Sequence, residues 1–228
     1  MKIFIFIQSR FSSTRLPGKA LLHLKGLPIV EWAYKRVAKG FPNTYILTSK
    51  DSSDDILEEY FKIKEINFFR GDLKNVLKRF YDASTKIGGI QDEDLIVRLT
   101  ADNIFPDESF LKLMIDYFQE NQCDYLTSSK PESKLPYGLS AEIFKYKYLK
   151  QAYKNATTAY EKEHVTPWII KAVPLTFLKL PNYPNYSQFR VTIDTLEDFL
   201  TMTKFTKNID NLLEAEALDL CKGLEKYD

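Results

Sequence analysis

Cysteine and histidine are scarce in this chain of 228 residues, which contains two of each. Neither Cys123 nor Cys221 belongs to a CxxC pair, and His23 and His164 are too few to build a cluster of metal-binding histidines. A disulfide framework and a structural zinc site are therefore not expected. This low cysteine content is typical of proteins that work in a reducing cytosol.

Long apolar runs and an excess of charge of one sign are also absent. The first apolar run, 3–7, is too short for the hydrophobic part of a signal peptide, and no stretch approaches the roughly 20 apolar residues of a membrane span. The formal net charge is +1, so the chain has no general basic field for nucleic acid. We expect a cytoplasmic protein whose partners are neither membranes nor nucleic acids, and any anion site must be built locally.

The composition is that of an ordinary globular protein, with 44% hydrophobic and 28% charged residues. Apolar runs that suit buried strands alternate with helical patterns over the first two-thirds of the chain, which predicts an α/β fold with a mixed, mostly parallel sheet. Strands are expected at 2–7, 44–49, 66–71, 94–100 and 123–129, and helices at 29–40, 54–60, 73–87 and 108–119.

The pattern changes after about residue 130. A loop at 130–138 precedes expected strands at 139–146, 174–180 and 189–194, with a helix at 163–172 interrupted near Pro167 and two helices at the end of the chain. We interpret the chain as one domain, 1–228, with a β-rich excursion inserted at 130–187. No internal repeat or linker is apparent.

Polar residues follow the predicted strands at the point where each strand ends. Ligands of open α/β sheets bind beyond the carboxyl ends of the strands, so these residues are expected to meet at one site. They occupy positions 8–19, 48–50, 70–72, 100–103 and 194–195.

The stretch after the first strand, QSRFSSTRLPGK, carries Arg10, Arg15 and Lys19 among small residues. Backbone N–H groups that small residues leave accessible, together with arginine and lysine side chains, are what a polyphosphate needs. The stretch matches neither the Walker A motif nor the GxGxxG fingerprint. Its composition alone is equally compatible with a solvated surface loop, and its place after a buried strand favours an anion site.

Asp102 and Asp194 each follow or end a predicted apolar strand, 94–100 and 189–194 respectively. Magnesium usually takes one or two carboxylates together with phosphate oxygens, so two such aspartates in one crevice would suit a metal site. Each has a simpler interpretation: Asp102 as a turn residue, and Asp194 with Thr195 as the start of a helix.

These residues also carry a family resemblance. The segments QSRFSSTRLPGKALLHLKGLPIVEW, FFRGDLKNVLKRFYDA, VRLTADN, GLSAEIF, AYEKEHVTPWI and VTIDTLEDF together resemble the sugar-acid cytidylyltransferases, in the branch of the spore-coat polysaccharide cytidylyltransferases. CMP-Kdo and CMP-sialic acid synthetases are more distant relatives. The resemblance covers roughly residues 1–200. It implies a Rossmann-like nucleotidyltransferase fold similar to GT-A, CTP as the donor, Mg²⁺ as the cofactor, release of pyrophosphate and a homodimer.

Carried onto this sequence, the resemblance implies the role of each site residue. Arg15, Lys19 and Asp102 would be catalytic, and Asp102 and Asp194 would hold Mg²⁺. Asp72, Glu142 and His164 would bind the acceptor, and the excursion at 130–187 would serve acceptor binding or dimerisation. The nucleotide would contact Gln8, Ser9, Arg10, Ser13, Thr14, Arg15, Lys19, Thr48, Arg70, Thr100 and Ala101.

The chain departs from the family pattern at a few positions. Ser9 replaces the usual alanine, Phe11 replaces a methionine or tyrosine, and Ser140 stands where the family has aspartate. Asn103 opens a turn that differs from the family's. The change at Ser140 points to a different acceptor. Without the resemblance, His164 suits a residue bonded to a carboxylate such as Glu161 or Glu163, and Glu142 suits a solvent-facing strand residue.

The expected acceptor is a sugar acid, specifically a nonulosonic acid used for surface polysaccharide. A nucleotidyltransferase acting on a sugar 1-phosphate or a phosphonate is the alternative, for which additional cations would come from Lys134, Lys145, Lys147, Lys154 and Lys162. A non-catalytic nucleotide-binding protein and a GT-A glycosyltransferase fit less well, because both strand-end aspartates are retained and TADN lacks the second aspartate of a DxD motif.

Overall fold

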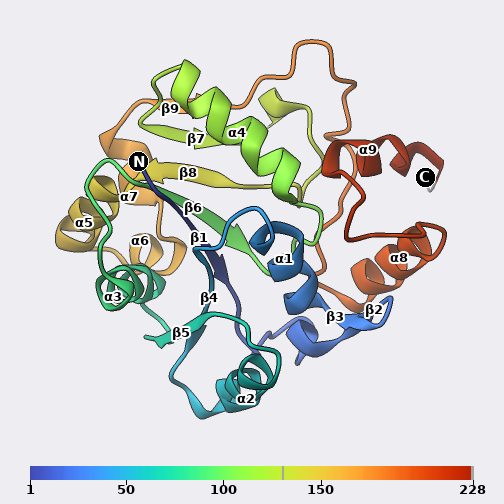
Figure 1. The fold of residues 1–228 in the computed structure, drawn as a ribbon, viewed down its shortest axis with the longest axis horizontal. Helices are drawn as coiled ribbons and strands as arrows, with labels where there is room; N and C mark the ends of the chain where they lie inside the picture. Colours follow the sequence, from blue (N-terminus) through green and yellow to red (C-terminus); the bar gives the residue numbers. More distant parts are fainter. Residues whose placement is uncertain (130, 227–228) are drawn as a thin grey trace.

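The computed structural model describes residues 1–129 and 131–226 and contains a seven-stranded sheet (Figure 1). The strand order across the sheet is β5-β4-β1-β6-β8-β7-β9. The strands are β1 (Ile3–Gln8), β4 (Thr44–Ser49), β5 (Phe68–Gly71), β6 (Leu95–Thr100), β7 (Tyr125–Thr127), β8 (Glu142–Lys145) and β9 (Leu175–Phe177). Two further short strands, β2 (His23–Leu24) and β3 (Leu27–Pro28), form a separate hairpin that the sequence did not predict.

The sheet is mixed and mostly parallel, as expected. β1 pairs in parallel with β4 and β6, β4 with β5, and β7 with β9. Only β8, among the described strands of this sheet, runs antiparallel to its neighbours β6 and β7.

Helices cover both faces of the sheet. Figure 1 shows α1 and α4 in front of it, whereas α3, α5, α6 and α7 gather on its left side. The helices are α1 (Ile29–Ala38), α2 (Asp55–Ile63), α3 (Val76–Ile87), α4 (Glu108–Glu120), α5 (Tyr146–Asn155), α6 (Ala159–His164), α7 (Pro167–Ala172), α8 (Leu196–Lys207) and α9 (Ala217–Lys222).

The first strand shows why the sheet is buried on both sides. Alternate side chains of a strand point to opposite faces, and here both faces are apolar. Ile5 and Ile7 pack in the cluster that contains residues of α1 and α4, whereas Phe4 and Phe6 pack in the cluster that contains residues of α3 and α5. These four side chains are at most 3% exposed, so the strand must be a continuous apolar run.

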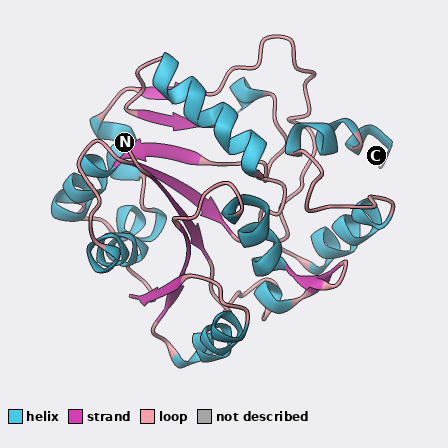
Figure 2. Cartoon of the chain, in the orientation of Figure 1, coloured by secondary structure: helices cyan, strands magenta, loops and turns pink. Residues whose placement is uncertain are grey.

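Two sequence predictions for the second half are wrong. The 130–187 segment is not β-rich: beyond residue 130, which lies outside the described residues, it contains three helices, and its strands β8 and β9 belong to the main sheet. The 189–194 segment is not a strand. It makes only isolated bridges, Tyr137 with Arg190 and Asn103 with Thr192, and Figure 2 shows it as loop.

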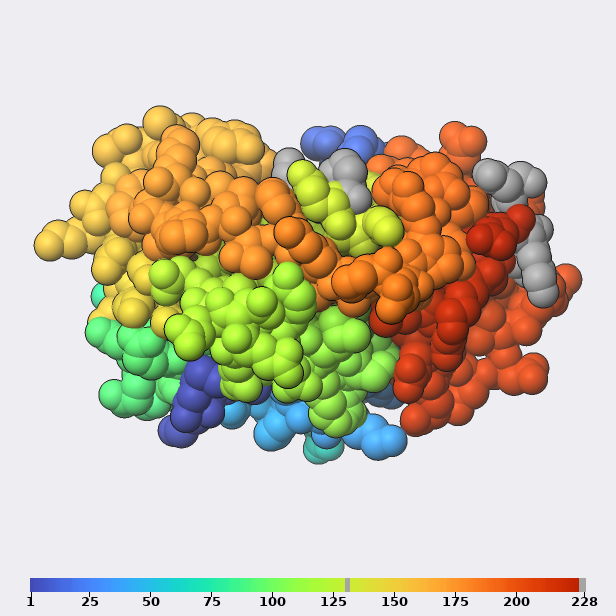
Figure 3. Space-filling view, turned by 90° about the horizontal axis from the view of Figure 1, so that it is seen from above, coloured from blue at the N-terminus to red at the C-terminus, as the bar shows by residue number. Residues whose placement is uncertain are grey.

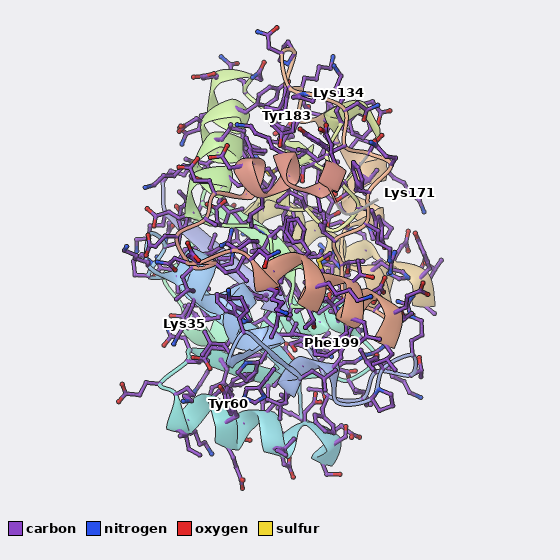
Figure 4. The ribbon with its side chains drawn as sticks, turned by 90° about the vertical axis from the view of Figure 1, so that its right-hand side faces the viewer. Lys35, Tyr60, Lys134, Lys171, Tyr183 and Phe199 are labelled. Atoms are coloured by element: carbon purple, nitrogen blue, oxygen red, sulfur yellow. The ribbon has the colours of Figure 1, made fainter. Side chains whose placement is uncertain are left out.

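The loop that leads to α8 crosses the top of the molecule. Figure 3 shows this segment beside the residues that follow position 131, and the backbone N–H of Tyr186 donates to Lys134 O across that contact. In Figure 4, Tyr183 lies near α9, where its hydroxyl donates to Leu218 O over 2.6 Å. Across the described residues, no helix is long and apolar enough to cross a membrane.

Candidate active site

The basic loop after β1 is fixed to the neighbouring strand by one buried carboxylate. Asp54 is fully buried, and its Oδ1 accepts the backbone N–H of Phe11 over 2.7 Å. Its Oδ2 accepts the hydroxyl of Thr48 and the backbone N–H of Ser49, each over 2.8 Å. The end of β4 therefore holds the start of the loop in place. The hydroxyl of Thr48, which was expected to meet the nucleotide, is committed to Asp54.

The loop also closes on itself around Phe11. The carbonyl oxygen of Phe11 accepts the N–H groups of Ser13 and Gly18, over 2.9 and 3.1 Å. Gly18 has φ +71°, and a Cβ placed there would lie 3.2 Å from the tip of the Phe11 ring. The aromatic ring and the glycine thus complement each other, which gives the departure at Phe11 a local structural role.

Lys19 lies between Asp102, in the turn after β6, and Asp194, in the loop before α8. Its Nζ is 2.9 Å from Asp102 Oδ2 and 2.9 Å from Asp194 Oδ1, and it donates to Ile193 O over 3.1 Å. The turn after β6 and the loop before α8 are 92 positions apart in sequence but meet at this one ammonium group. The loop prediction and the aspartate prediction therefore describe a single site.

Asp194 is surrounded by cations. Arg15 Nη2 lies 2.9 Å from its Oδ1, and Arg190 Nη2 lies 2.8 Å from its Oδ2. Burial by itself would raise the pKa of Asp194, but the hydrogen bond and charge of Lys19, together with Arg15 and Arg190, hold the pKa below its ordinary value. The carboxylate therefore stays ionised at neutral pH.

Two adjoining cavities open around these charges. The larger, about 900 Å³, extends from the ends of β1 and β6 across to α6, and the smaller, about 190 Å³, lies against the basic loop. The size of the larger cavity is that of a small-molecule site. Of the predicted site residues, the larger cavity is lined by Gln8, Arg10, Arg15, Thr100, Asp102, His164 and Asp194. The smaller is lined by Gln8, Ser9, Arg10, Ser13, Thr14, Arg15, Lys19, Thr100, Ala101, Asp102 and Asp194.

The chemistry of the two aspartates fits a magnesium ion that arrives with a polyphosphate. No group of three or more histidine, cysteine, aspartate or glutamate side chains suits a metal in the part of the chain that the structure describes. Asp102 and Asp194 nevertheless contact one common cation, Lys19 Nζ, and both line the same cavities. Magnesium needs only one or two protein carboxylates when phosphate oxygens complete its shell.

His164 ends α6 and lines the larger cavity. Its ring centroid lies 4.5 Å from that of Tyr160. Its side chain makes no hydrogen bond or ion pair with another described residue, and the carboxylate of Glu161 is instead bonded to Thr158 and Lys171. The prediction that Glu161 accepts a hydrogen bond from His164 is therefore wrong. The imidazole of His164 is available to a ligand.

The turn that follows His164 has an unusual backbone. Val165 is fully buried with φ +69°, and the N–H of Thr166 donates to His164 O over 2.8 Å across it. This is a γ-turn of the rare, strained kind, and a β-branched residue adopts it at a cost of about 1–3 kcal/mol. Tertiary contacts must hold it. One of them is the hydroxyl of Thr166, which donates to Glu142 Oε1 over 2.8 Å.

Arg70 and Asp72 line neither of these cavities. Arg70 forms ion pairs with Asp55 and Glu58 of α2 and donates to Ser49 O over 2.7 Å. Asp72 accepts the N–H groups of Lys74 and Asn75, over 2.9 and 2.8 Å, and so shapes the turn into α3. Both residues organise the loop after β5. The sequence motif that contains Arg70 and Asp72 therefore lies next to the site, but the residues that line the cavity are those that follow it, 73–76.

Other residues of the cavity wall had no role assigned from the sequence. Lys74 and Asn75 follow β5, so the same strand-end argument would have reached them two positions further on. Tyr137 has no such signal because it precedes a strand. Of the five lysines considered for a phosphorylated acceptor, Lys162 lines the cavity; Lys145 and Lys147 instead pair with Glu93.

Comparison with known proteins agrees with this geometry. Residues 4–226 match the cytidylyltransferase family. The chain is 31% identical to the spore coat polysaccharide biosynthesis protein SpsF of Bacillus subtilis, over 86% of this chain and 83% of that protein. It is 28% identical to the 8-amino-3,8-dideoxy-manno-octulosonate cytidylyltransferase of Shewanella sediminis, over 55% of this chain and 51% of that enzyme.

A solved cytidylyltransferase from Leptospira borgpetersenii superimposes with a TM-score of 0.88 and 30% identity, over 99% of this chain and 94% of that one. The basic loop, the sheet, Asp102 and Asp194 all lie within the matched region. The chain therefore belongs to the cytidylyltransferase family and is a nucleotidyltransferase.

Proposed function

We propose that the protein transfers CMP from CTP to a sugar acid of the nonulosonic acid class, with Mg²⁺ as cofactor and pyrophosphate as the second product. The observation that carries the proposal is the placement of Lys19 between Asp102 and Asp194 beside a cavity of about 900 Å³. A relative that matches this chain is a cytidylyltransferase for 8-amino-3,8-dideoxy-manno-octulosonate, which is a sugar acid.

In this mechanism a hydroxyl of the acceptor attacks the α-phosphorus of CTP in line, a P–O bond to the acceptor forms, and the bond to pyrophosphate breaks. Arg10, Arg15 and Lys19 bind the triphosphate, and Arg15 and Lys19 stabilise the negative charge that grows on the leaving pyrophosphate. Catalysis of this kind needs alignment and charge compensation rather than a protein nucleophile.

Asp102 and Asp194 are the residues that would hold Mg²⁺, which supplies charge neutralisation at the phosphates and lowers the pKa of the attacking hydroxyl. The acceptor occupies the far part of the larger cavity, where Lys74, Lys162 and His164 offer hydrogen-bond donors to a carboxylate. Lys74 lies in the loop between β5 and α3, whereas Lys162 and His164 lie on α6, so together they would orient the acceptor relative to the α-phosphorus.

Substitution of Asp102 tests the proposal. We expect Asp102→Asn to lower kcat for pyrophosphate release by at least about 100-fold, as for loss of other charge-stabilising groups, without changing the melting temperature. Asp116→Asn, at an exposed position of α4, is the matched control and should retain full activity. Wild-type turnover by Asp102→Asn would rule out this assignment of the carboxylate.

The acceptor is tested with a panel. Pyrophosphate release is measured with CTP, UTP and GTP, each against 3-deoxy-manno-octulosonate, N-acetylneuraminate and glucose 1-phosphate. Turnover with CTP and a sugar acid supports the proposal, whereas turnover only with the sugar phosphate supports the alternative acceptor class.

We also propose that the protein works as a homodimer. Light scattering during gel filtration gives the molar mass of the protein in solution and so tests this proposal.

A further inference from the structure

A chain of hydrogen bonds connects the acceptor side of the sheet to its first strand. Arg98 lies on the central strand β6, and its Nη1 donates to Glu142 Oε2 on β8. Its Nη2 donates to Gln8 Oε1 at the end of β1, over 3.2 Å. One guanidinium group therefore joins three adjacent strands at the edge where the cavities open.

Both carboxylate oxygens of Glu142 accept hydrogen bonds from other residues of the protein. While its Oε2 accepts from Arg98, its Oε1 accepts the hydroxyls of Tyr125 and Thr166. Burial and the adjacent Glu142 raise the pKa of Tyr125 well above 10, so its hydroxyl remains a donor. Glu142 lines a small polar cavity of about 120 Å³ that shares Thr100, Ser129 and Ser140 with the 900 Å³ cavity, and it does not line the larger cavity itself. This geometry differs from the direct acceptor contact that the resemblance implied.

The bond from Arg98 determines how the amide of Gln8 is oriented. A guanidinium group has five N–H donors and no acceptor, so the atom of Gln8 that faces it must be the carbonyl oxygen. The amide nitrogen is then turned away from Arg98, and it makes no hydrogen bond to any residue that the structure describes. Gln8 lines both main cavities. Its two N–H donors are therefore available to a ligand.

The orientation of Arg98 depends on these same contacts. Its Nε is buried and has no partner within the described part of the chain, so the bonds from Nη1 and Nη2 are what fix the guanidinium plane. If Glu142 were removed, Arg98 would lose its anionic partner. Gln8 would then lose the group that decides which end of its amide faces the cavity.

We propose that Gln8 donates from its amide N–H groups to an oxygen of CTP, and that Arg98 and Glu142 are positioning residues that impose this polarity. The inference rests on the proposed function in that CTP is the ligand of this cavity. It adds a direction to the contact: Gln8 acts as a donor, and it does not accept from the exocyclic amine of cytosine.

Calorimetric titration of the protein with CTP and Mg²⁺, in the absence of any acceptor, tests this direction. Gln8→Glu keeps an oxygen for Arg98 but replaces the N–H donors by a second oxygen, so we expect CTP binding to weaken by at least about tenfold. If Gln8 instead accepted from the cytosine amine, Gln8→Glu would bind CTP as tightly as the wild type or more tightly. That result would overturn the proposal.

A double-mutant cycle tests the roles of Arg98 and Glu142. We expect Arg98→Met and Glu142→Gln each to weaken CTP binding several-fold, because the amide of Gln8 becomes free to turn. In the background of Gln8→Met, which has no amide to orient, Arg98→Met should have no additional effect. Fully additive effects would show that Arg98 does not act through Gln8. If Arg98→Met does not fold, Glu142→Gln in the same two backgrounds gives the same cycle.

Failure of this inference and failure of the proposed function give different results. If no sugar acid supports turnover while the wild type binds CTP, the acceptor proposal fails and the titrations of the Gln8 variants remain decisive. If sugar acids are turned over and Gln8→Glu binds CTP normally, only the donor role of Gln8 is lost.

Discussion

Gly138, before β8, allows two loops of the site to approach each other more closely than any other residue would. Its φ is +111°, and a Cβ at this position would lie 2.5 Å from the backbone nitrogen of Thr192. The neighbouring Tyr137 bridges to Arg190 and also stacks over its guanidinium group at 4.9 Å. The backbone contact at Gly138 thus helps to place the segment that leads to Asp194.

We expect Gly138→Ala to destabilise the protein by at least about 3 kcal/mol, since a strained φ and a collision with backbone atoms act together. Gly26→Ala is the matched control, because Gly26 has φ +84° but no atom within 4 Å of an added Cβ. It should cost only about 1 kcal/mol, from the backbone conformation alone. Urea unfolding of both variants measures the difference. Equal losses would mean that the close approach to Thr192 contributes nothing.

At the residue scale, the sequence predicted those site residues whose position depends on strand ends. Arg15, Lys19 and Asp102 meet because each closely follows an apolar strand, whereas Asp194 joins them from the loop before α8 and not from the strand end that the sequence predicted. Arg70 was misleading, since its partners on α2 become neighbours only when the strands are assembled. Sequence position indicates that a side chain is near the site, but competing carboxylates and carbonyl groups decide where it points.

At the element scale, the start of α8 combines a helix cap with an ion pair. Thr195 and Asp198 form a capping box, and Arg190 Nε lies 2.8 Å from Asp198 Oδ1. Burial by itself would raise the pKa of Asp198, but Arg190 and the backbone N–H groups of Asp194 and Thr195 lower it to about 2. This cap therefore stabilises the start of α8 and also holds Asp194 in position.

The depressed pKa of Asp198 predicts a dependence of stability on pH. Because the pKa is lower in the folded chain than in the unfolded chain, the ionised carboxylate contributes about 2 kcal/mol above pH 5 and loses this contribution as the pH falls from 4 towards 2. Asp198→Asn should therefore be less stable than the wild type at pH 7, and the two should converge at low pH.

Thermal unfolding at a series of pH values measures this difference. Asp219→Asn, which removes an exposed pair with Lys222, is the control and should change stability by less than about 0.5 kcal/mol at any pH. A gap between wild type and Asp198→Asn that stays constant down to pH 2 would contradict the assigned role of Asp198.

Two errors in the elements predicted from the sequence, the missed helix α5 and the strand wrongly expected at 189–194, share a physical cause. The sequence of α5, YKYLKQAYKN, buries only Tyr146, Leu149 and Ala152, so its apolar signal is too weak to separate it from the strand before it. The 189–194 segment has a strand-like alternation, but the residues beside it form only single bridges, and a strand requires a continuous neighbour. Both errors arise where tertiary contacts override a short local pattern.

At the scale of the whole molecule, the two cysteines report on the integrity of the core. Cys123 and Cys221 are 4% and 0% exposed and are not joined in a disulfide. Burial raises the pKa of both thiols, that of Cys221 to about 12. Thiols that are buried and protonated react slowly, so each should become reactive only when the surrounding structure opens.

We expect a chromogenic disulfide reagent to modify neither cysteine of the native protein within minutes, and to modify both in concentrated guanidinium chloride. The single variants Cys123→Ala and Cys221→Ala assign each signal, since each should leave one reactive thiol after unfolding. Rapid labelling of one cysteine in the native protein would indicate that its part of the core opens locally.

The reversed direction of β8 has a consequence for how this molecule could change its ligand. Because β8 is antiparallel to its neighbour β7, the single connection between these two strands has both its ends at the edge where the cavities open, and its residues Leu135, Tyr137 and Ser140 line the larger cavity. The loops that follow β1, β5 and β6 also line the cavities, but each of them leads into a helix before the chain returns to the sheet. A library directed at the connection between β7 and β8 would therefore alter one wall of the cavity without changing a helix that packs on the sheet.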